Sequence, residues 1–226
     1  MENKEAEKIN SAKDFYKEIH PELFSDTIIK KSCKTTREMV DYHLEKITSK
    51  SQEYSFQEFC RELAEREICP NLIHQTGPTG HGDSKVDSET YPVADEIALT
   101  WFGGFSPRAS KEKWAFAMSA TKLWKPKIKI DLEKAVKTKR NYTEFYFFTN
   151  QYISDLKKST VQDEFSKTYN IGIHIMDKTW ILDKLFTCRH LDLIVKYFSF
   201  NKSDIEEEKE IGVKDLERQK TLEKYE

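Results

Sequence analysis

The stretch Trp114-Ala115-Phe116-Ala117-Met118-Ser119-Ala120 decides the fold class of this 226-residue chain. It is almost wholly apolar, and a short apolar run of this kind predicts a strand that is buried on both faces of a sheet. Such sheets belong to α/β proteins, in which helices cover each face. The chain is long enough for one core of about 150 residues plus additional segments.

The second half of the chain alternates between strand and helix patterns. Apolar and aromatic residues predict strands at 144–149 and 171–176, and helices are predicted at 154–168 and 178–186. Strands that are separated by helices pair in parallel. We therefore expect an α/β fold, a three-layer α/β/α sandwich with a central mixed sheet.

Further elements are predicted before Trp114. A helix at 54–67 has one apolar face, which is formed by Phe56, Phe59, Cys60, Leu63 and Ala64. An earlier helix is predicted at 36–47. Its apolar face is formed by Met39, Val40, His43, Leu44 and Ile47. Strands are expected at 71–75 and 85–93, joined by a glycine-rich turn at 77–84, with a further strand-like run at 95–102.

Changes in composition divide the chain into three regions. Residues 1–50 are expected to form an N-terminal helical extension, with a charged helix at 3–20 and an irregular connector at 21–34. Residues 51–200 are expected to form the core domain. Residues 201–226 carry nine acidic and six basic side chains and few apolar ones, which predicts a charged helical linker or tail. Such a linker often precedes another module, so we expect a further C-terminal module in a longer parent protein.

Asp87, Glu89 and Lys122 have the chemistry of a metal-dependent nuclease. Alternation along a strand places Asp87 and Glu89 on the same side. Two carboxylates on one face suit a hard divalent cation, which activates water for attack on a phosphodiester. An amine such as that of Lys122 stabilises the developing negative charge. Each residue alone would be typical of a solvated strand, and their joint occurrence is what predicts a site.

The segments that carry these residues follow one another in the order of a known family. Over roughly residues 52–190 the chain resembles the PD-(D/E)XK restriction endonucleases, and among them the Mrr-like branch. The similar segments are Phe56-Gln57-Glu58-Phe59-Cys60, Gly82-Asp83-Ser84-Lys85-Val86-Asp87, Phe116-Ala117-Met118-Ser119-Ala120-Thr121-Lys122, Phe147-Phe148-Thr149-Asn150 and Ile173-His174-Ile175-Met176-Asp177. The resemblance implies a restriction-endonuclease-like fold.

The resemblance also implies an activity and the residues that perform it. Asp87 would be the metal-binding aspartate, with Lys122 as the catalytic lysine and Glu58 or Glu62 as an accessory acid. The cofactor would be Mg²⁺, with Mn²⁺ as a substitute, and the substrate double-stranded DNA. Two copies would associate to cleave both strands, and the biological role would be restriction or antiviral defence.

One position departs from the family pattern. Two residues before Lys122, where the family carries Glu, Asp or Gln, this chain has Ala120. In one interpretation the missing metal ligand has moved to Glu89 or to the helix at 54–67. In another the register is shifted and Ser119 occupies the variable position. In a third the domain is a catalytically silent nucleic-acid-binding or assembly module.

A basic block flanks these residues. From 108 to 140 there are eleven Lys or Arg and three acidic residues. Within it, Lys125 and Lys127 are expected to neutralise phosphates and Trp124 to stack on a base or sugar, and Lys85 is a further expected DNA contact.

A helix is the alternative interpretation of the same block. Pro126 is favoured in a first helical turn, and Ile128, Leu132 and Val136 follow at helical spacing. The lysines would then form a solvated face, and both interpretations can hold together.

Composition narrows the remaining possibilities. The 37 basic and 39 acidic side chains give no overall nucleic-acid signature. The four cysteines include no Cys-x-x-Cys pair, which argues against a zinc site. No apolar stretch approaches the roughly 20 residues of a membrane helix, and the first residues lack the features of a signal peptide. We therefore expect a cytoplasmic protein without a membrane partner.

Overall fold

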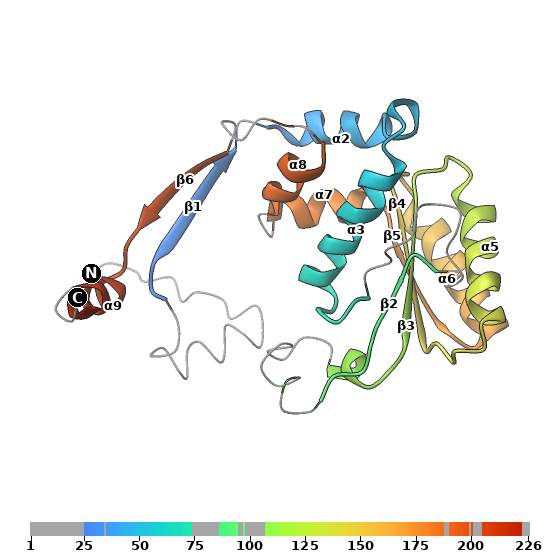
Figure 1. The fold of residues 1–226 in the computed structure, drawn as a ribbon. Coiled ribbons are helices and arrows are strands. Elements are labelled where there is room, and N and C mark those ends of the chain that lie inside the picture. The colour runs from blue at the N-terminus through green and yellow to red at the C-terminus, as the bar shows by residue number, and fades with distance from the viewer. Residues whose placement is uncertain are drawn as a thin grey trace, which may run out of the picture.

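A four-stranded mixed sheet forms the centre of the molecule (Figure 1). In spatial order its strands are β2 (Ser88–Glu89), β3 (Trp114–Ser119), β4 (Glu144–Thr149) and β5 (Gly172–Met176). β2 is antiparallel to β3, whereas β3, β4 and β5 run parallel. The computed structural model describes residues 25–33, 35–73, 86–94, 97, 107–187, 190–198, 200 and 205–222. The α/β class and the mixed sheet are confirmed.

Helices lie on both faces of this sheet (Figure 1). One face carries α2 (Arg37–Glu45), α3 (Glu53–Glu67), α7 (Lys178–Thr187) and α8 (Leu191–Phe198). The other carries α5 (Trp124–Lys137) and α6 (Asp155–Tyr169). Short 3-10 turns lie at Thr48–Lys50 and Pro107–Ser110. Among the described residues, no helix is long and apolar enough to cross a membrane.

Strand β3 contributes side chains to two hydrophobic cores, one on each face of the sheet. Trp114, Phe116 and Met118 lie in the first core, with α3, α7 and α8. Ala115 and Ala117 lie in the second core, with α5 and α6. Successive side chains of a strand point to opposite faces, so the apolar run supplies both cores at once. Its predicted burial on both faces is confirmed.

The apolar faces predicted for the two N-terminal helices are confirmed with one exception. The face of α3 is fully buried, as predicted, and consists of Phe56, Phe59, Cys60, Leu63 and Ala64. On α2, Val40, His43 and Leu44 are buried, but Met39 is 50% exposed. At about 100° per residue, Met39 lies at the border of the stripe that Val40, His43 and Leu44 form. The patterns did not predict α8, which packs its apolar face on α3.

Two terminal segments differ from their predicted conformation. Residues 28–33 lie within the expected irregular connector and form β1 (Ile28–Cys33). Residues 206–210 lie within the expected helical linker or tail and belong to β6 (Ile205–Glu210), which is antiparallel to β1.

The register of this pairing places Ile28 opposite Glu210 and Cys33 opposite Ile205. Local patterns could not show it, because the two segments are distant in the sequence and each one alone resembles solvated chain.

The ribbon of β1 and β6 extends away from the sheet, with α9 (Val213–Leu222) at its far end (Figure 1). Asp26 caps α9, since its carboxylate accepts hydrogen bonds of 2.9 Å from the N–H groups of Lys214 and Asp215. In return, the Asp215 carboxylate accepts a hydrogen bond of 3.2 Å from the N–H of Thr27. These hydrogen bonds join the start of β1 to the start of α9, the helix that residues 213–222 form.

Several expected elements lie wholly or partly outside the described residues. They are the helix at 3–20, the glycine-rich turn at 77–84 and, apart from Ile97, the run at 95–102. The strand pair predicted at 71–75 and 85–93 is shorter where it is described. It consists of β2 and an isolated bridge between Leu72 and Thr90.

The contribution of α2 to the first core makes the domain boundary testable. We expect a fragment of residues 35–200 to melt within a few degrees of the full chain, because the described residues of both cores lie between Val40 and Phe200. A fragment of residues 51–200 lacks the buried Val40, Leu44 and Ile47, each worth about 1.5–3 kcal/mol. Circular dichroism melting should therefore show a much lower Tm. Equal melting temperatures for the two fragments would contradict the assignment of α2 to the core.

Candidate functional site

Asp87 lies where β2 begins to separate from β3. Its N–H donates to the carbonyl of Phe116 at 3.0 Å, and its Oδ2 accepts from the N–H of Met118 at 2.7 Å. The carboxylate thus satisfies a backbone donor of β3. The negative charge of Asp87 also acts on Cys60 of α3. Burial of the Cys60 thiol raises its pKa, and the charge of Asp87 raises it further. Asp87 therefore lies near the edge formed by the carboxyl ends of the parallel strands, where open α/β sheets place their ligands.

The surroundings of Asp87 disfavour its ionised form. Burial raises the pKa of Asp87 to about 6, and the negative charge of Asp131 adds to the rise. The hydrogen bond from Met118 opposes it, as do the positive charges of Lys127 and Lys134. At neutral pH the charged form of this carboxylate therefore destabilises the folded state, and an added positive charge would reduce this destabilisation.

Asp131 is an acidic residue on the buried side of α5. It is 6% exposed and lies on the same stripe as Ile128 and Leu132. Its Oδ1 accepts a hydrogen bond of 2.7 Å from Lys127 Nζ, and Lys134 Nζ is 3.9 Å away. Its Oδ2 is buried and has no hydrogen-bond partner among the described residues. A buried carboxylate oxygen without a partner is costly, so it marks a position at which a ligand would be stabilising.

Asp87 and Asp131 form what we call the acidic pair. The two carboxylates repel each other, as the pKa of Asp87 shows, and two lysines neutralise them only in part. Carboxylate oxygens in this setting suit a hard divalent cation. Within the described ranges, however, no group of three or more His, Cys, Asp or Glu side chains is placed to hold a metal ion. A cation held by the acidic pair alone would take its remaining ligands from water or substrate oxygens.

Glu89 belongs to a different cluster. It forms an ion pair of 2.6 Å with Arg140 and accepts a hydrogen bond from the hydroxyl of Tyr142. Burial and this contact raise the pKa of Tyr142 to about 12. Arg140 follows the C-terminal end of α5, whereas Lys127 lies near its start. The structure therefore does not group Glu89 with the partners of Asp87, and the metal role of Glu89 stays a prediction.

The candidate accessory acids on α3 also have partners. Glu58 Oε2 accepts from Arg61 at 3.0 Å. Burial opposes ionisation of Glu62, but hydrogen bonds from Lys196 and Tyr197 of α8 outweigh it and lower the pKa of Glu62 to about 2. Glu62 thus links α3 to α8. A catalytic role for Glu58 or Glu62 stays a prediction.

The region around Ala120 explains why this position cannot easily carry a metal ligand. Ala120 is buried in the first core, and its carbonyl accepts a hydrogen bond of 3.0 Å from Thr48 Oγ1. A carboxylate here would enter an apolar environment. In the shifted register, Ser119 would take the variable position; its Oγ accepts from the N–H of Thr121 at 3.3 Å. Lys122 is exposed just beyond β3, and its catalytic role stays a prediction.

The helical interpretation of the basic block is confirmed, because α5 begins at Trp124. Trp124 is half-buried against the second core, which leaves part of the indole exposed. Lys125 Nζ lies 3.7 Å from Glu164 Oε2 of α6, and Lys127 is held by Asp131. The expected DNA contacts of these three residues stay predictions, and Lys85 lies outside the described residues.

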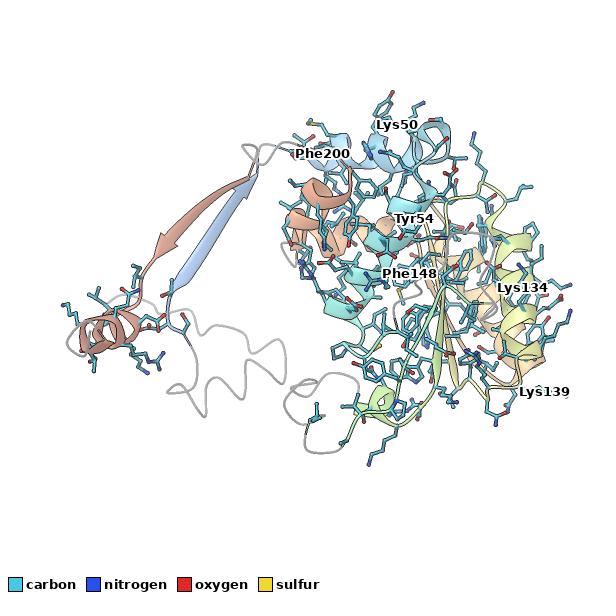
Figure 2. All side chains as sticks on the ribbon, viewed as in Figure 1. Lys50, Tyr54, Lys134, Lys139, Phe148 and Phe200 are labelled. Atoms are coloured by element: carbon cyan, nitrogen blue, oxygen red, sulfur yellow. The ribbon has the colours of Figure 1, made fainter. Side chains whose placement is uncertain are left out.

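The outer surface of α5 is basic along its length. Figure 2 shows Lys134 and Lys139 on this side of the molecule, across the sheet from Tyr54 of α3. The buried stripe of α5 contains Ile128 and Leu132, as predicted, and also Asp131 and Ala135, whereas Val136 is 39% exposed.

Asp131 was missed as a candidate from the sequence. It was counted only as one of three acidic residues in a basic block. A signal was present, because Asp131 lies three residues after Ile128 and directly before Leu132, on the face that the same pattern predicts to be buried. A carboxylate on a buried helical stripe needs a partner, and that requirement marks it as a candidate ligand.

The raised pKa of Asp87 predicts a pH-dependent stability. The folded state binds the proton more tightly than the unfolded state, so this stabilisation is complete below about pH 4 and is lost as the pH rises through about 6. At pH 7.5 and without metal, Asp87→Asn should raise the Tm by several degrees, since the shift corresponds to at most about 3 kcal/mol. At pH 4 this advantage should vanish. Asp155→Asn, at a fully exposed position, is the control; a lower Tm for Asp87→Asn at pH 7.5 would contradict the account.

Comparisons of the chain with protein-family models, with curated proteins and with solved structures find no match.

Proposed function

We propose that this chain is a Mg²⁺-dependent endonuclease domain that hydrolyses phosphodiester bonds in DNA. The observation that carries the proposal is the acidic pair, where the buried Oδ2 of Asp131 has no hydrogen-bond partner and the pKa of Asp87 is raised toward neutrality. Asp131 lies on the basic helix α5, and a basic surface suits an anionic substrate. A role in defence against foreign DNA in the cytoplasm rests on the family resemblance.

The element order supports a PD-(D/E)XK type of domain. The helix α3 precedes an antiparallel pairing of β2 with β3, and α5 then leads into the parallel strand β4. Asp87 and Lys122 flank the C-terminal half of β3, as the resemblance implies. In this arrangement Asp131 of α5 takes over the role of the carboxylate that is missing at position 120.

Each residue of the cluster has a distinct role in this proposal. Asp87 and Asp131 would hold the cation, which when bound lowers the pKa of a coordinated water and offsets negative charge on the phosphate. Lys127 would orient Asp131 through its hydrogen bond to Oδ1, while Oδ2, which has no partner among the described residues, would bind the cation. Lys122 is free to approach the phosphate from the solvent side and stabilises the charge that develops during hydrolysis. Cleavage of both strands needs two such sites, so we expect two copies to act together.

A catalytically silent nucleic-acid-binding module is the second candidate. Ala120 favours it, because this buried position has lost the family's carboxylate and its carbonyl is bound by Thr48. In that case the acidic pair would be a charged cluster that Lys127 and Lys134 neutralise.

Plasmid cleavage tests the proposed function. With the full chain we expect cleavage in Mg²⁺ and Mn²⁺, and none in chelator. Asp87→Ala, Asp131→Asn and Lys122→Ala should each lower the rate by about 100- to 1,000-fold, the usual effect of removing a preorganised charged group. Melting curves of the three variants check that they are folded.

Two matched variants make this test specific. Glu133→Gln changes a half-buried carboxylate on the same helix as Asp131, and its rate should stay within about two-fold of the wild type. Glu89→Gln should also retain cleavage, because Glu89 is bound to Arg140. If folded Asp131→Asn kept full cleavage activity and Glu89→Gln lost it, the second metal ligand would be Glu89 and not Asp131. No cleavage under any condition would favour the silent module.

A further inference from the structure

Three apolar side chains at one edge of the sheet are unusually exposed. Leu123 is 71% exposed, Tyr152 69% and Leu156 78%. Over the rest of the described residues between 35 and 200, no large apolar side chain is more exposed than Tyr42, at 61%. Exposed apolar groups that gather in one place are typical of a binding surface.

The topology brings these three side chains to the same edge. Leu123 follows β3 and Tyr152 follows β4, and these strands are parallel neighbours whose last residues, Ser119 and Thr149, are paired. Leu156 lies in the first turn of α6. The helices α5 and α6 that start here are themselves adjacent, on the same face of the sheet (Figure 1).

Positive charge surrounds this apolar group. Lys122, Lys125 and Lys157 are exposed on the same loops and first helical turns, against the acidic Asp155 and Glu164. The N-terminal turns of α5 and α6 have no side-chain cap, so their N–H dipoles add to the positive field. Flat or branched apolar groups among cations match the chemistry of a nucleotide, which joins an apolar ring to an anionic phosphate.

We propose that this edge, formed by Leu123, Tyr152 and Leu156 with Lys122, Lys125 and Lys157, binds the bases of an unpaired nucleic-acid strand where β3 and β4 end. The inference rests on the proposed function and specifies its substrate. In a duplex the faces of the bases are stacked on one another and cannot contact these side chains. An unpaired strand offers each base for stacking on Tyr152 and for contact with the leucines. The preferred substrate is therefore DNA with a single-stranded segment.

Fluorescence anisotropy with the full chain tests this inference. The probe is a labelled 20-nucleotide DNA strand, either free or annealed to its complement, in chelator so that no cleavage occurs. The free strand should bind more tightly than the duplex. Tyr152→Ala should weaken binding of the free strand by about ten-fold or more, the usual effect of losing one stacked base, and change duplex binding by less than about two-fold. Tyr152→Phe keeps the aromatic ring and should bind the free strand as the wild type does. Tyr42→Ala is the control and should not change binding, because Tyr42 is similarly exposed but lies on α2.

The outcomes separate this inference from the proposed function. Equal losses on both probes, or no loss on either, would overturn the inference while metal-dependent cleavage could persist. A preference for the free strand without any cleavage would support the inference and overturn the nuclease proposal. If Tyr152→Ala instead abolished dimers in size-exclusion chromatography and left binding unchanged, the edge would be a contact between copies of the chain, and the inference would be wrong.

Discussion

The hydrogen bond from the N–H of Met118 to the carboxylate of Asp87 is the contact on which the candidate site depends. It fixes Asp87 at the point where β2 leaves β3, at the cost of burying an acid whose pKa rises to about 6. The backbone donor of β3 gains a partner, but the charge of Asp87 is only partly compensated. In the proposed function, a bound cation would supply the missing compensation.

The small side chains of β3 allow α5 to pack against the sheet. Ala115 and Ala117 face the second core, where α5 packs with Ile128 and Leu132. The stripe that carries these apolar residues also carries Asp131, so the packing that buries the helix brings a second carboxylate within electrostatic reach of Asp87. Lys127 occupies one oxygen of Asp131 and leaves the other without a partner. Packing and site chemistry thus share one helix face.

The sequence predicted the parts of this structure that depend on local patterns. The strand at 144–149 was predicted at both ends, and the buried face of α3 was predicted residue by residue. The pairing of β1 with β6 could not be predicted, because it joins two charged segments far apart in the chain. Asp87 was identified from strand alternation, but its partner was expected at Glu89, two residues along. Only the packing of α5 shows that Glu89 pairs with Arg140 and that the negative charge of Asp131 contributes to the raised pKa of Asp87.

The most direct test of the central claim is anomalous diffraction from crystals of the chain soaked in Mn²⁺. We expect one difference peak between the carboxylates of Asp87 and Asp131, within about 2.3 Å of Asp131 Oδ2, since hard cations bind oxygen at about 2.0–2.6 Å. The peak should be absent in crystals of Asp131→Asn. A peak at Glu89 with Arg140 displaced, or no peak at the acidic pair in crystals that bind manganese elsewhere, would contradict the account.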